Sequence, residues 1–510
     1  MSATVVERIE SPVRVSAWPP YPTVYEINTW VWLADLSQQY GRNVDLSSVP
    51  SVEWDAIAVY GFDSVWLMGV WERSPAGMAI ANQNKSLLDE FWRVLPDFGT
   101  EDNVGSPYCV RRYVVDERLG GPEGLTVTRK ELSRRGMQLI LDFVPNHIAP
   151  DHPWVAEHPE YFIRGTSEDA ENDPSSYIEI SGAVFAHGRD PNFPAWPDVL
   201  QLNGFDAGLR QAVIEIISTI AQQCDGIRCD MAMLMLHQMF ERTWGDRAGT
   251  RPATEYWVDV ISATKKKYPD FLFLAEVYWD LEWELQQQGF DFCYDKKLYD
   301  RLEHSHAESV LLHLGADLSY QNKVVRFIEN HDEPRAAAIF SPARQQALAL
   351  TIATLPGMRL FHEGQFEGRK VRPSVFLGRR PNEPIDQDRR DFYRALLERV
   401  DEPVFREGQW KLCDRTGWPD NASFQNLLAW CWLKDHERYL VIVNLSDCPA
   451  QARVQVELAD AGVKSWHLID AFSNAIYERD AAEMQSPGLY VELGPWSYHF
   501  FQCQQSSSDS

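Results

Sequence analysis

Short apolar runs recur along the chain up to about residue 400, and most are followed by a stretch in which apolar residues return every three or four positions. This alternation of strand and helix patterns is typical of parallel strands joined by right-handed crossovers. Eight runs can be identified, which is the number of strands in a (β/α)8 barrel. They span residues 24–33, 62–70, 137–145, 226–231, 271–279, 290–295, 324–330 and 358–364.

The helix pattern before the fourth run shows how the elements alternate. It begins after Asp206, whose short acidic side chain is well placed to cap the first turn. The apolar positions that share one face are Leu209, Val213, Ile216, Ile217 and Ile220. Such a face predicts a helix that covers the outside of the barrel.

Two stretches depart from this rhythm. Residues 148–204 are rich in Pro, His, Asp and aromatic residues and follow the third run as a long excursion with little periodicity. From residue 402 the pattern changes to alternating strand-like segments, which predict an antiparallel β-sandwich. The expected fold is therefore an α/β TIM barrel with an inserted domain and a C-terminal β-sandwich. The predicted parts are 1–147 and 205–401 for the barrel, 148–204 for the insertion, 402–503 for the sandwich and 504–510 for a polar, disordered tail.

The charge balance narrows the class of ligand. The 510 residues carry a net charge of −26 and give a pI near 4.9, and this charge repels phosphate backbones and anionic lipid headgroups. We therefore expect neither a nucleic-acid partner nor a membrane partner. A neutral substrate fits better, and the 19 Trp residues offer flat rings for sugar faces, although most large aromatic residues serve packing. The oligomeric state is left open by the sequence.

The eight Cys residues are scattered and form no zinc-type CxxC pair; Cys224, Cys229, Cys293 and Cys431 lie inside apolar runs. This pattern predicts reduced, mostly buried thiols. The first residues include Glu7 and lack the apolar run of a secretory signal, and no stretch of about 20 apolar residues predicts a membrane span. We therefore expect a cytoplasmic protein.

Polar side chains gather where the predicted barrel strands end. The carboxyl ends of the strands in a (β/α)8 barrel surround one shared pocket, so carboxylates at these ends are candidates for catalysis. These residues are Asp142, Asn146 and His147 after the third strand, Arg228 and Asp230 on the fourth, Glu276 on the fifth, and Glu329, His331 and Asp332 on the seventh. A single acid of this kind is more simply explained as a helix cap or a surface ion pair. Acids at four strand ends, each beside Arg, His or Asn, favour a converging catalytic site.

The surroundings of Asp230 and Glu276 predict different chemistry for the two carboxyl groups. Arg228 lies two residues before Asp230, so both face one side of the strand and the guanidinium favours the ionised form that a nucleophile needs. Glu276 follows the apolar run FLFLA, an environment that raises a carboxyl pKa and makes a proton donor. A retaining glycosidase uses two such groups about 5 to 5.5 Å apart. Asp332 beside His331 is a candidate for contacts to sugar hydroxyls in the transition state.

Four segments resemble the ordered motifs of glycoside hydrolase family 13, the α-amylase family. They are DFVPNH at 142–147, GIRCD at 226–230, LAEVYW at 274–279 and FIENHD at 327–332. The resemblance runs from about residue 20 to 500, includes an eighth-strand segment at 354–365, and implies a domain B at the insertion and a domain C at the sandwich. It implies these roles: Asp230 as nucleophile, Glu276 as general acid/base and Asp332 as transition-state stabiliser, with Arg228, His147, His331, Asp142 and Tyr108 as substrate contacts.

Some positions depart from the family pattern. Met233 and Leu234 stand where many amylases carry Lys and His, so polar contacts on the reducing-end side are expected to be missing. Cys109 stands where α-glucosidase-like members have an Asp that holds the terminal glucose, which argues against a strict terminal-glucose cutter. The stretch at 151–162 resembles the domain B entry of maltosyltransferases that use maltose 1-phosphate, and ordinary loop packing explains it equally well.

The leading hypothesis is a retaining α-glycosidase that hydrolyses α-1,4-glucosidic bonds in glucans or maltooligosaccharides. The alternative is a transglycosidase, maltosyltransferase-like or trehalose-forming, in which a sugar or phosphate acceptor replaces water. A weaker alternative is a non-catalytic carbohydrate-binding protein, against which the three carboxylates argue. The chemistry needs no cofactor. Asn146 resembles a calcium ligand of many amylases, but a hydrogen bond that fixes the loop explains this residue equally well.

Overall fold

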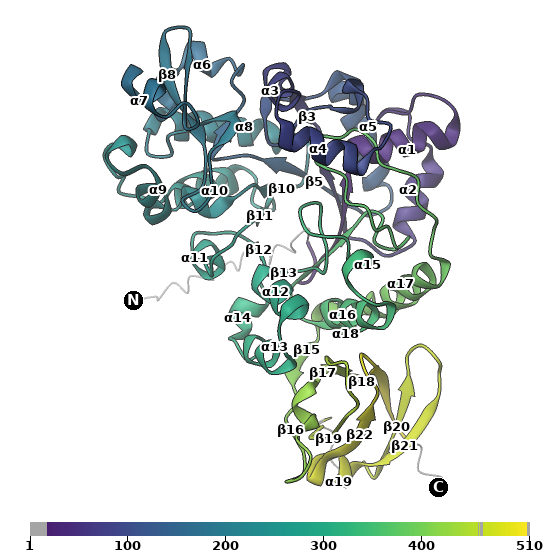
Figure 1. The fold of residues 1–510 in the computed structure, drawn as a ribbon. Helices are drawn as coiled ribbons and strands as arrows, with labels where there is room; N and C mark the ends of the chain where they lie inside the picture. Colours follow the sequence, from purple (N-terminus) through teal and green to yellow (C-terminus); the bar gives the residue numbers. More distant parts are fainter. Residues whose placement is uncertain (1–17, 457, 459–462, 507–510) are drawn as a thin grey trace, which may run out of the picture.

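The computed structural model describes residues 18–456, 458 and 463–506. Eight parallel strands close into a barrel in the order β1-β14-β13-β12-β11-β10-β5-β2, with helices around it (Figure 1). The predicted (β/α)8 fold is therefore confirmed. The barrel strands are β1 (Thr23–Asn28), β2 (Ser64–Met68), β5 (Gln138–Phe143), β10 (Gly226–Cys229), β11 (Leu272–Ala275), β12 (Phe292–Tyr294), β13 (Val324–Arg326) and β14 (Met358–His362).

The barrel strands read as continuous apolar runs because their residues are buried on both faces, between the barrel interior and the outer helices. One predicted boundary is wrong. The run at 24–33 does not continue as a strand, because the Asn28 side chain accepts a hydrogen bond from the Val31 N–H and caps α1 (Thr29–Tyr40). Each of the other predicted runs contains one barrel strand.

The outer layer consists of helices that connect the barrel strands. The helix predicted after Asp206 is α8 (Ala207–Ile220), and the Asp206 carboxylate accepts the Leu209 N–H at 2.8 Å as a cap. The other helices around the barrel are α1, α2 (Ser51–Ala58), α5 (Gly121–Ser133), α9 (His237–Trp244), α10 (Tyr256–Lys267), α11 (Glu282–Gln287), α12 (Lys296–His304), α13 (Ala307–Leu314), α14 (Leu318–Gln321), α15 (Ala336–Ile339), α16 (Pro342–Thr354), α17 (Gln387–Val400) and α18 (Pro403–Glu407).

Two excursions interrupt the barrel. The first follows β2 and was not predicted from the apolar pattern; it consists of β3 (Trp71–Arg73), α3 (Pro75–Ala81), α4 (Lys85–Val94) and β4 (Val110–Val115). The second is the insertion after β5, which forms a four-stranded sheet in the order β6-β9-β8-β7 and is more regular than its sequence indicates. Its elements are β6 (His147–Ile148), α6 (Trp154–Glu157), α7 (Ser167–Asn172), β7 (Tyr177–Ile180), β8 (Ala183–Gly188) and β9 (Trp196–Gln201).

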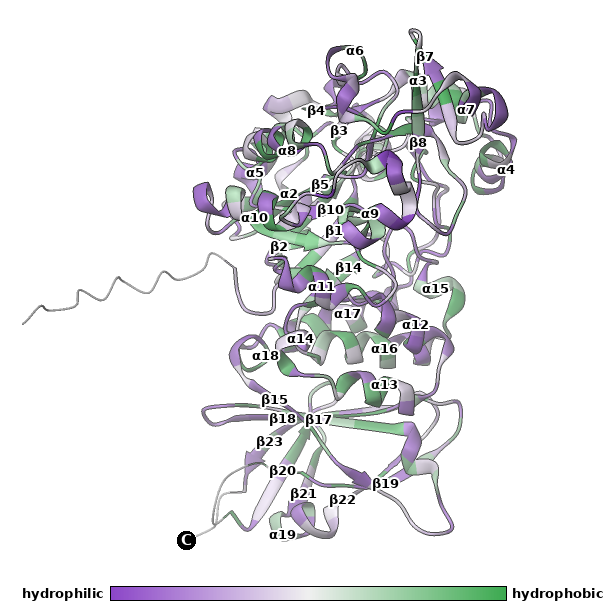
Figure 2. Ribbon diagram, turned by 90° about the vertical axis from the view of Figure 1, so that its left-hand side faces the viewer, coloured by the Kyte–Doolittle hydropathy of each residue, from purple (hydrophilic) through white to green (hydrophobic). Residues whose placement is uncertain are grey.

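The C-terminal part forms the predicted antiparallel sandwich, below the barrel in Figure 2. A six-stranded sheet, β15-β17-β18-β23-β20-β21, packs on a three-stranded sheet, β16-β19-β22. On β17, Trp432 faces the barrel, where its indole N–H donates to the Thr354 carbonyl at 2.6 Å, whereas Cys431 faces the small sheet. The elements are β15 (Gln409–Leu412), β16 (Arg415–Thr416), β17 (Leu427–Lys434), β18 (Glu437–Asn444), β19 (Ala450–Val454), β20 (Ser465–Asp470), β21 (Ile476–Asp480), α19 (Ala481–Glu483), β22 (Leu489–Leu493) and β23 (Tyr498–Gln505).

The disordered tail predicted for 504–510 begins too early. Gln504 and Gln505 belong to β23, where they pair with His467 and Trp466 of β20, because backbone pairing continues past the last apolar side chain. Residues 507–510 lie outside the described residues, so that part stays a prediction. Within the described ranges, no helix is both long and apolar enough to cross a membrane.

Candidate active site

A cavity of about 350 Å³ opens at the carboxyl ends of the barrel strands. The predicted site residues that line it are Tyr108, His147, Asp230, Glu276 and Asp332. The barrel ladder brings two of them side by side, since the Asp230 N–H donates to the Phe143 carbonyl at 2.8 Å and the Glu276 N–H donates to the Cys229 carbonyl at 3.0 Å. Carboxyl groups from neighbouring strand ends therefore meet in one pocket.

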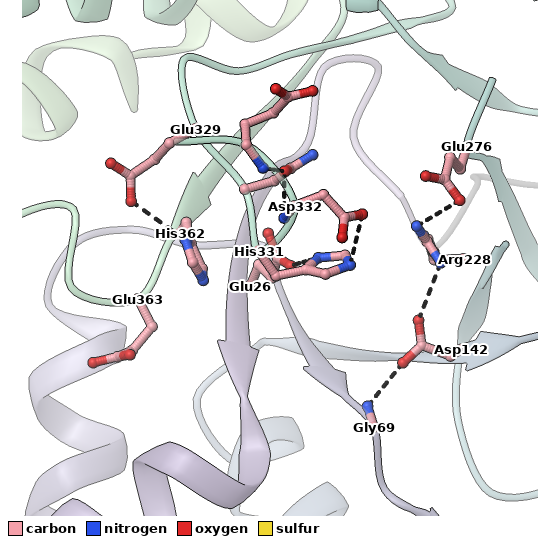
Figure 3. A network of polar contacts seen from close by, with 12 residues as sticks. Glu26, Gly69, Asp142, Arg228, Glu276, Glu329, His331, Asp332, His362 and Glu363 are labelled. Atoms are coloured by element: carbon pink, nitrogen blue, oxygen red, sulfur yellow. Dashed lines mark hydrogen bonds and ion pairs between the residues drawn. The ribbon is translucent and has the colours of Figure 1, made fainter. Parts of the chain in front are cut away.

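Arg228 is fully buried and lies close to three carboxylates, of which Asp142 and Glu276 are drawn in Figure 3. Its Nη1 atom lies 2.7 Å from Asp230 Oδ1 and 3.8 Å from Asp142 Oδ1. Its Nη2 atom lies 2.7 Å from Glu276 Oε2. Asp142 is held in turn by the Gly69 N–H, which donates to its Oδ2 at 2.9 Å. One guanidinium thus aligns acids from β5, β10 and β11, which are adjacent in the barrel.

Glu276 has the properties of a proton donor. Its Oε2 accepts the Met231 N–H at 2.7 Å, and its Oε1 accepts the Tyr278 hydroxyl at 2.6 Å. Burial, assisted by the nearby charge of Asp230 and opposed by Arg228, raises the pKa of Glu276 to about 7. Because Oε2 accepts the Met231 N–H and lies against the charged Nη2 of Arg228, the proton of the neutral acid belongs on Oε1, next to Tyr278 in the cavity wall.

The pKa of Asp230 is raised and not lowered as the sequence argument expects. Arg228 acts in the expected direction, but complete burial outweighs it, and the charges of Asp332 and Asp142 act with burial. The sequence shows the neighbouring Arg228, but it does not show the burial that removes solvent from the Asp230 carboxyl group. Since Glu276 takes up a proton near pH 7, the charge of Arg228 remains available for the ionised form of Asp230.

A second charge network is centred on His331 (Figure 3). Its Nε2 lies 3.0 Å from Asp332 Oδ2, its Nδ1 lies 2.5 Å from Glu26 Oε1, and its ring also contacts the Tyr108 hydroxyl. Burial opposes protonation, but Asp332 and Glu26 together hold the pKa of His331 well above its usual value. Burial is likewise outweighed at Asp332, where His331 lowers the pKa to about 2. Asp332 is therefore ionised throughout the neutral range.

His147 and Asn146 lie side by side at the start of the insertion. Burial lowers the pKa of His147 to about 3, so its imidazole is neutral where it packs on Trp196 in the cavity wall. The Asn146 Oδ1 accepts the Gln201 side-chain amide at 2.9 Å, and in the part of the chain that the structure describes no group of three His, Cys, Asp or Glu residues is arranged to hold a metal ion. Calcium binding at Asn146 stays a prediction.

Among the residues of the site that the sequence does not predict are Glu26, Asp198, Met231 and Tyr278. Asp198 lines the cavity, where burial raises its pKa to about 6. Met231 has a φ of 43°, and this left-handed backbone accompanies the N–H contact to Glu276. Glu26 left a signal in the sequence, as a single acid inside the apolar run of the first strand, and Tyr278 lies in the motif LAEVYW.

Not every acid at a strand end belongs to the cavity. Glu329 is buried, and its Oε1 accepts Nη1 of Arg335 at 2.8 Å while its Oε2 accepts the Ala336 N–H at 2.7 Å. Although burial opposes it, the Arg335 guanidinium lowers the pKa of Glu329. Glu329 therefore anchors the start of α15.

The residues that depart from the family motifs are buried and do not line the cavity. Met233 and Leu234 are at most 3% exposed, and Met231 lines the cavity in this region. The Cys109 thiol is also buried and contacts the carbonyl oxygen of Asp198 at 3.0 Å. The polar contacts that the motif comparison expects to be missing are thus replaced by apolar packing.

A family model described as the catalytic domain of alpha amylase matches residues 54–427. The chain belongs to the α-amylase family. The match includes Asp142, Arg228, Glu276 and Asp332, and it also includes the insertion after β5. The predicted family resemblance is confirmed.

Two curated relatives are similar over different shares of the chain. The alpha-1,4-glucan:maltose-1-phosphate maltosyltransferase of Rhodospirillum rubrum is 28% identical over 231 residues, which are 44% of this chain and 27% of that protein. The alpha-amylase MalA of Haloarcula japonica is 22% identical over 375 residues, 71% of this chain and 46% of that protein. The chain thus spans less than half the length of these curated relatives.

Solved structures of α-amylases share the fold. The maltogenic alpha-amylase AmyB of Thermotoga neapolitana superposes with a TM-score of 0.68 at 17% identity, covering 96% of this chain and 99% of that chain. The alpha-amylase of Geobacillus thermoleovorans gives a TM-score of 0.66 at 16% identity, covering 95% and 99%. The fold is therefore shared along nearly the whole length of the chain.

We predict that Glu26→Gln lowers stability in a pH-dependent way. The pKa of Glu26 is lowered and that of His331 is raised. Their pairing therefore makes its full contribution to the free energy of unfolding above the usual pKa of Glu26 and below about pH 6.5. This contribution is lost as the pH rises through the pKa of His331 in the folded protein. Urea unfolding should show a loss of roughly 1–3 kcal/mol at pH 6 and a smaller loss at pH 9.

Glu363→Gln provides the matched control, because Glu363 is also buried but pairs with Arg380, which does not titrate in this range. Its loss of stability should be equal at the two pH values. Equal losses at both pH values for Glu26→Gln as well would show that His331 is not held protonated by Glu26.

Proposed function

We propose that this α-amylase family protein is a retaining α-glycosidase that cleaves α-1,4-glucosidic bonds in glucans or maltooligosaccharides. The observation that carries the proposal is the contact of Arg228 with both Asp230 and Glu276 at 2.7 Å, combined with a pKa of about 7 for Glu276. One carboxyl group is thus suited to donate a proton while the other, beside it, is suited to attack. This is the pair that a retaining glycosidase requires.

In the first step, Asp230 Oδ attacks the anomeric carbon while the Oε1 proton of Glu276 passes to the departing glycosidic oxygen. The bond from the anomeric carbon to that oxygen breaks, and a covalent glycosyl-Asp230 ester forms. The positive charge that develops on the sugar is stabilised by Asp332, which remains ionised because His331 lowers its pKa to about 2.

In the second step, Glu276 is ionised and acts as a base. It removes a proton from water, the oxygen of which attacks the anomeric carbon, and the ester bond to Asp230 breaks. Arg228 contacts both groups, so it favours the carboxylate of Glu276 after the proton has left and that of Asp230 after the ester is cleaved. Neutral His147 and the Tyr108 ring line the cavity, and we expect both to contact the sugar.

A transglycosidase is the second candidate, and two observations favour it. Several relatives are named maltosyltransferases, among them that of Rhodospirillum rubrum. In addition, Met231 lines the cavity beside Glu276 where an acceptor approaches, and an apolar side chain there disfavours water. The first step is the same, and only the attacking oxygen differs.

A product profile separates the two reactions. The purified protein is incubated with maltooligosaccharides, with maltose 1-phosphate plus an acceptor, and with trehalose, alongside the Asp230→Asn variant. We expect shorter oligosaccharides from the maltooligosaccharides and no product from Asp230→Asn. Accumulation of longer chains would support the transglycosidase and contradict the hydrolase. No turnover of any α-glucoside would contradict both proposed activities.

The proposed partner is therefore an α-glucan or oligosaccharide, and the proposed location is the cytoplasm. The location is supported by the thiols, because each of the eight Cys residues is free and only Cys448 is exposed. Unpaired thiols of this kind are typical of reducing compartments.

A further inference from the structure

A second hollow lies on the outside of the barrel, against the start of domain B. Its volume is about 490 Å³. One side is the segment from His152 to Tyr161, which includes α6, and the floor is a stripe of α8 formed by Ala212, Ile216 and Thr219. The two elements lie close together in both ribbon views (Figures 1 and 2). We call this hollow the α6–α8 groove. The cavity that holds Asp230 shares none of its lining residues.

Aromatic rings form the domain B side of the groove. Trp154 meets Tyr161 edge to face with ring centroids 5.3 Å apart, and His158 stacks on Tyr161 at 4.6 Å with an angle of 10° between the rings. Both Trp154 and Tyr161 are half-buried, whereas the neighbouring Phe162 is fully buried in the core. The segment therefore does more than pack the loop, because it keeps part of two large rings accessible.

Polar atoms at the edges of these rings have no protein partner. Within the described residues, neither the indole N–H of Trp154 nor the Tyr161 hydroxyl is paired with a protein group, and neither is among the buried unpaired atoms. Aromatic rings that carry a solvent-accessible polar group at the edge are suited to bind a ligand with an apolar face and a rim of hydroxyl groups. A pyranose ring has that form.

The charges around the groove disfavour an anionic ligand. Glu157 and Glu215 are exposed at its edge, and the guanidinium of Arg112 is already paired with Glu72 at 3.0 Å. A phosphate would therefore meet two acids and no free cation among these lining groups. The balance favours a neutral sugar chain over maltose 1-phosphate or another phosphorylated ligand.

We propose that the α6–α8 groove is a second binding site for a neutral α-glucan chain, and this rests on the proposed function for the identity of the sugar. A long chain that occupies both the groove and the catalytic cavity, or that is held near the cavity by the groove, gains affinity through a higher local concentration. A short oligosaccharide occupies the cavity alone and gains nothing. The groove thus selects for polymer length.

The test uses the double variant Trp154→Ala/Tyr161→Ala in the full chain. KM for soluble amylose should rise at least about tenfold, whereas kcat and KM for maltotriose should stay within about twofold. In gels that contain amylose, the same two substitutions in an Asp230→Asn background should reduce retardation. Because this second measurement needs no turnover, it tests the groove even if the protein cleaves no glucan.

Trp92→Ala is the matched control, since Trp92 is 52% exposed on α4 and is not part of the groove. It should leave KM and retardation unchanged. Unchanged retardation of the double variant by amylose would overturn the proposal. An equal loss of activity toward maltotriose and amylose would also overturn it, because it would indicate a structural role for the two rings.

Discussion

Replacement of Asp230 by Asn should lower kcat on maltooligosaccharides by a factor on the order of 10⁴ or more, as expected when a nucleophile that acts together with its partners is lost. The amide cannot form the glycosyl ester, while the hydrogen bond from Arg228 Nη1 retains an oxygen acceptor. Substrate binding should therefore be affected far less than turnover. Steady-state kinetics combined with calorimetric binding of maltoheptaose measures both quantities.

Asp225→Asn is the control for this substitution. Asp225 precedes the same strand, β10, at its opposite end, where its carboxylate lies 2.6 Å from Arg129 and accepts the Leu139 N–H. Its replacement should lower stability and leave kcat within about threefold. A comparable loss of kcat in both variants would contradict a chemical role for Asp230.

Replacement of Glu276 by Gln should lower kcat by roughly 10²- to 10⁴-fold on glucans. The wild-type rate should also decline above about pH 7, because the proton donor has a pKa of about 7 and loses its proton there. Gln does not titrate, so this basic limb should disappear in the variant. An aryl α-glucoside with an acidic leaving group needs less protonation and should be cleaved with a smaller deficit.

Glu282→Gln is the matched control for that pH profile. Glu282 is also buried and its pKa is also raised by burial, but it lies on α11 outside the catalytic cavity. Its replacement should leave the basic limb in place. A basic limb that persists in Glu276→Gln would assign the titration to another group.

The sequence was sufficient to predict the barrel because its strands are buried on both faces and read as apolar runs. The strand ends follow from the same runs, so the positions of Asp230 and Glu276 can be predicted from the sequence alone. The helix that begins after the Asn28 cap shows the limit of the apolar pattern. The residues after Asn28 are as apolar as those of a strand, but they form a helix. The sequence predicts an irregular domain B because its short strands pair across turns and lack a clear alternation of apolar and polar residues.

Contacts between distant residues could not be predicted from one sequence. Glu26 and His331 are 305 positions apart and meet only because β1 and β13 both border β14. The Tyr278 contact to Glu276 depends on the backbone after β11, and the raised pKa of Asp230 depends on burial that no local pattern records. The residue types were visible in the sequence, whereas their pairing and protonation followed from the fold.

The most direct test of the proposed mechanism is to trap the glycosyl-enzyme. The protein is incubated with a C5-fluorinated α-maltosyl fluoride, in which fluorine slows hydrolysis of the ester, and its peptides are analysed by mass spectrometry. We expect a mass increase of one glycosyl group on the peptide that contains Asp230, and none in Asp230→Asn. A label on another carboxylate, or no label while the wild-type protein still cleaves the reagent, would contradict the assignment of Asp230 as the nucleophile.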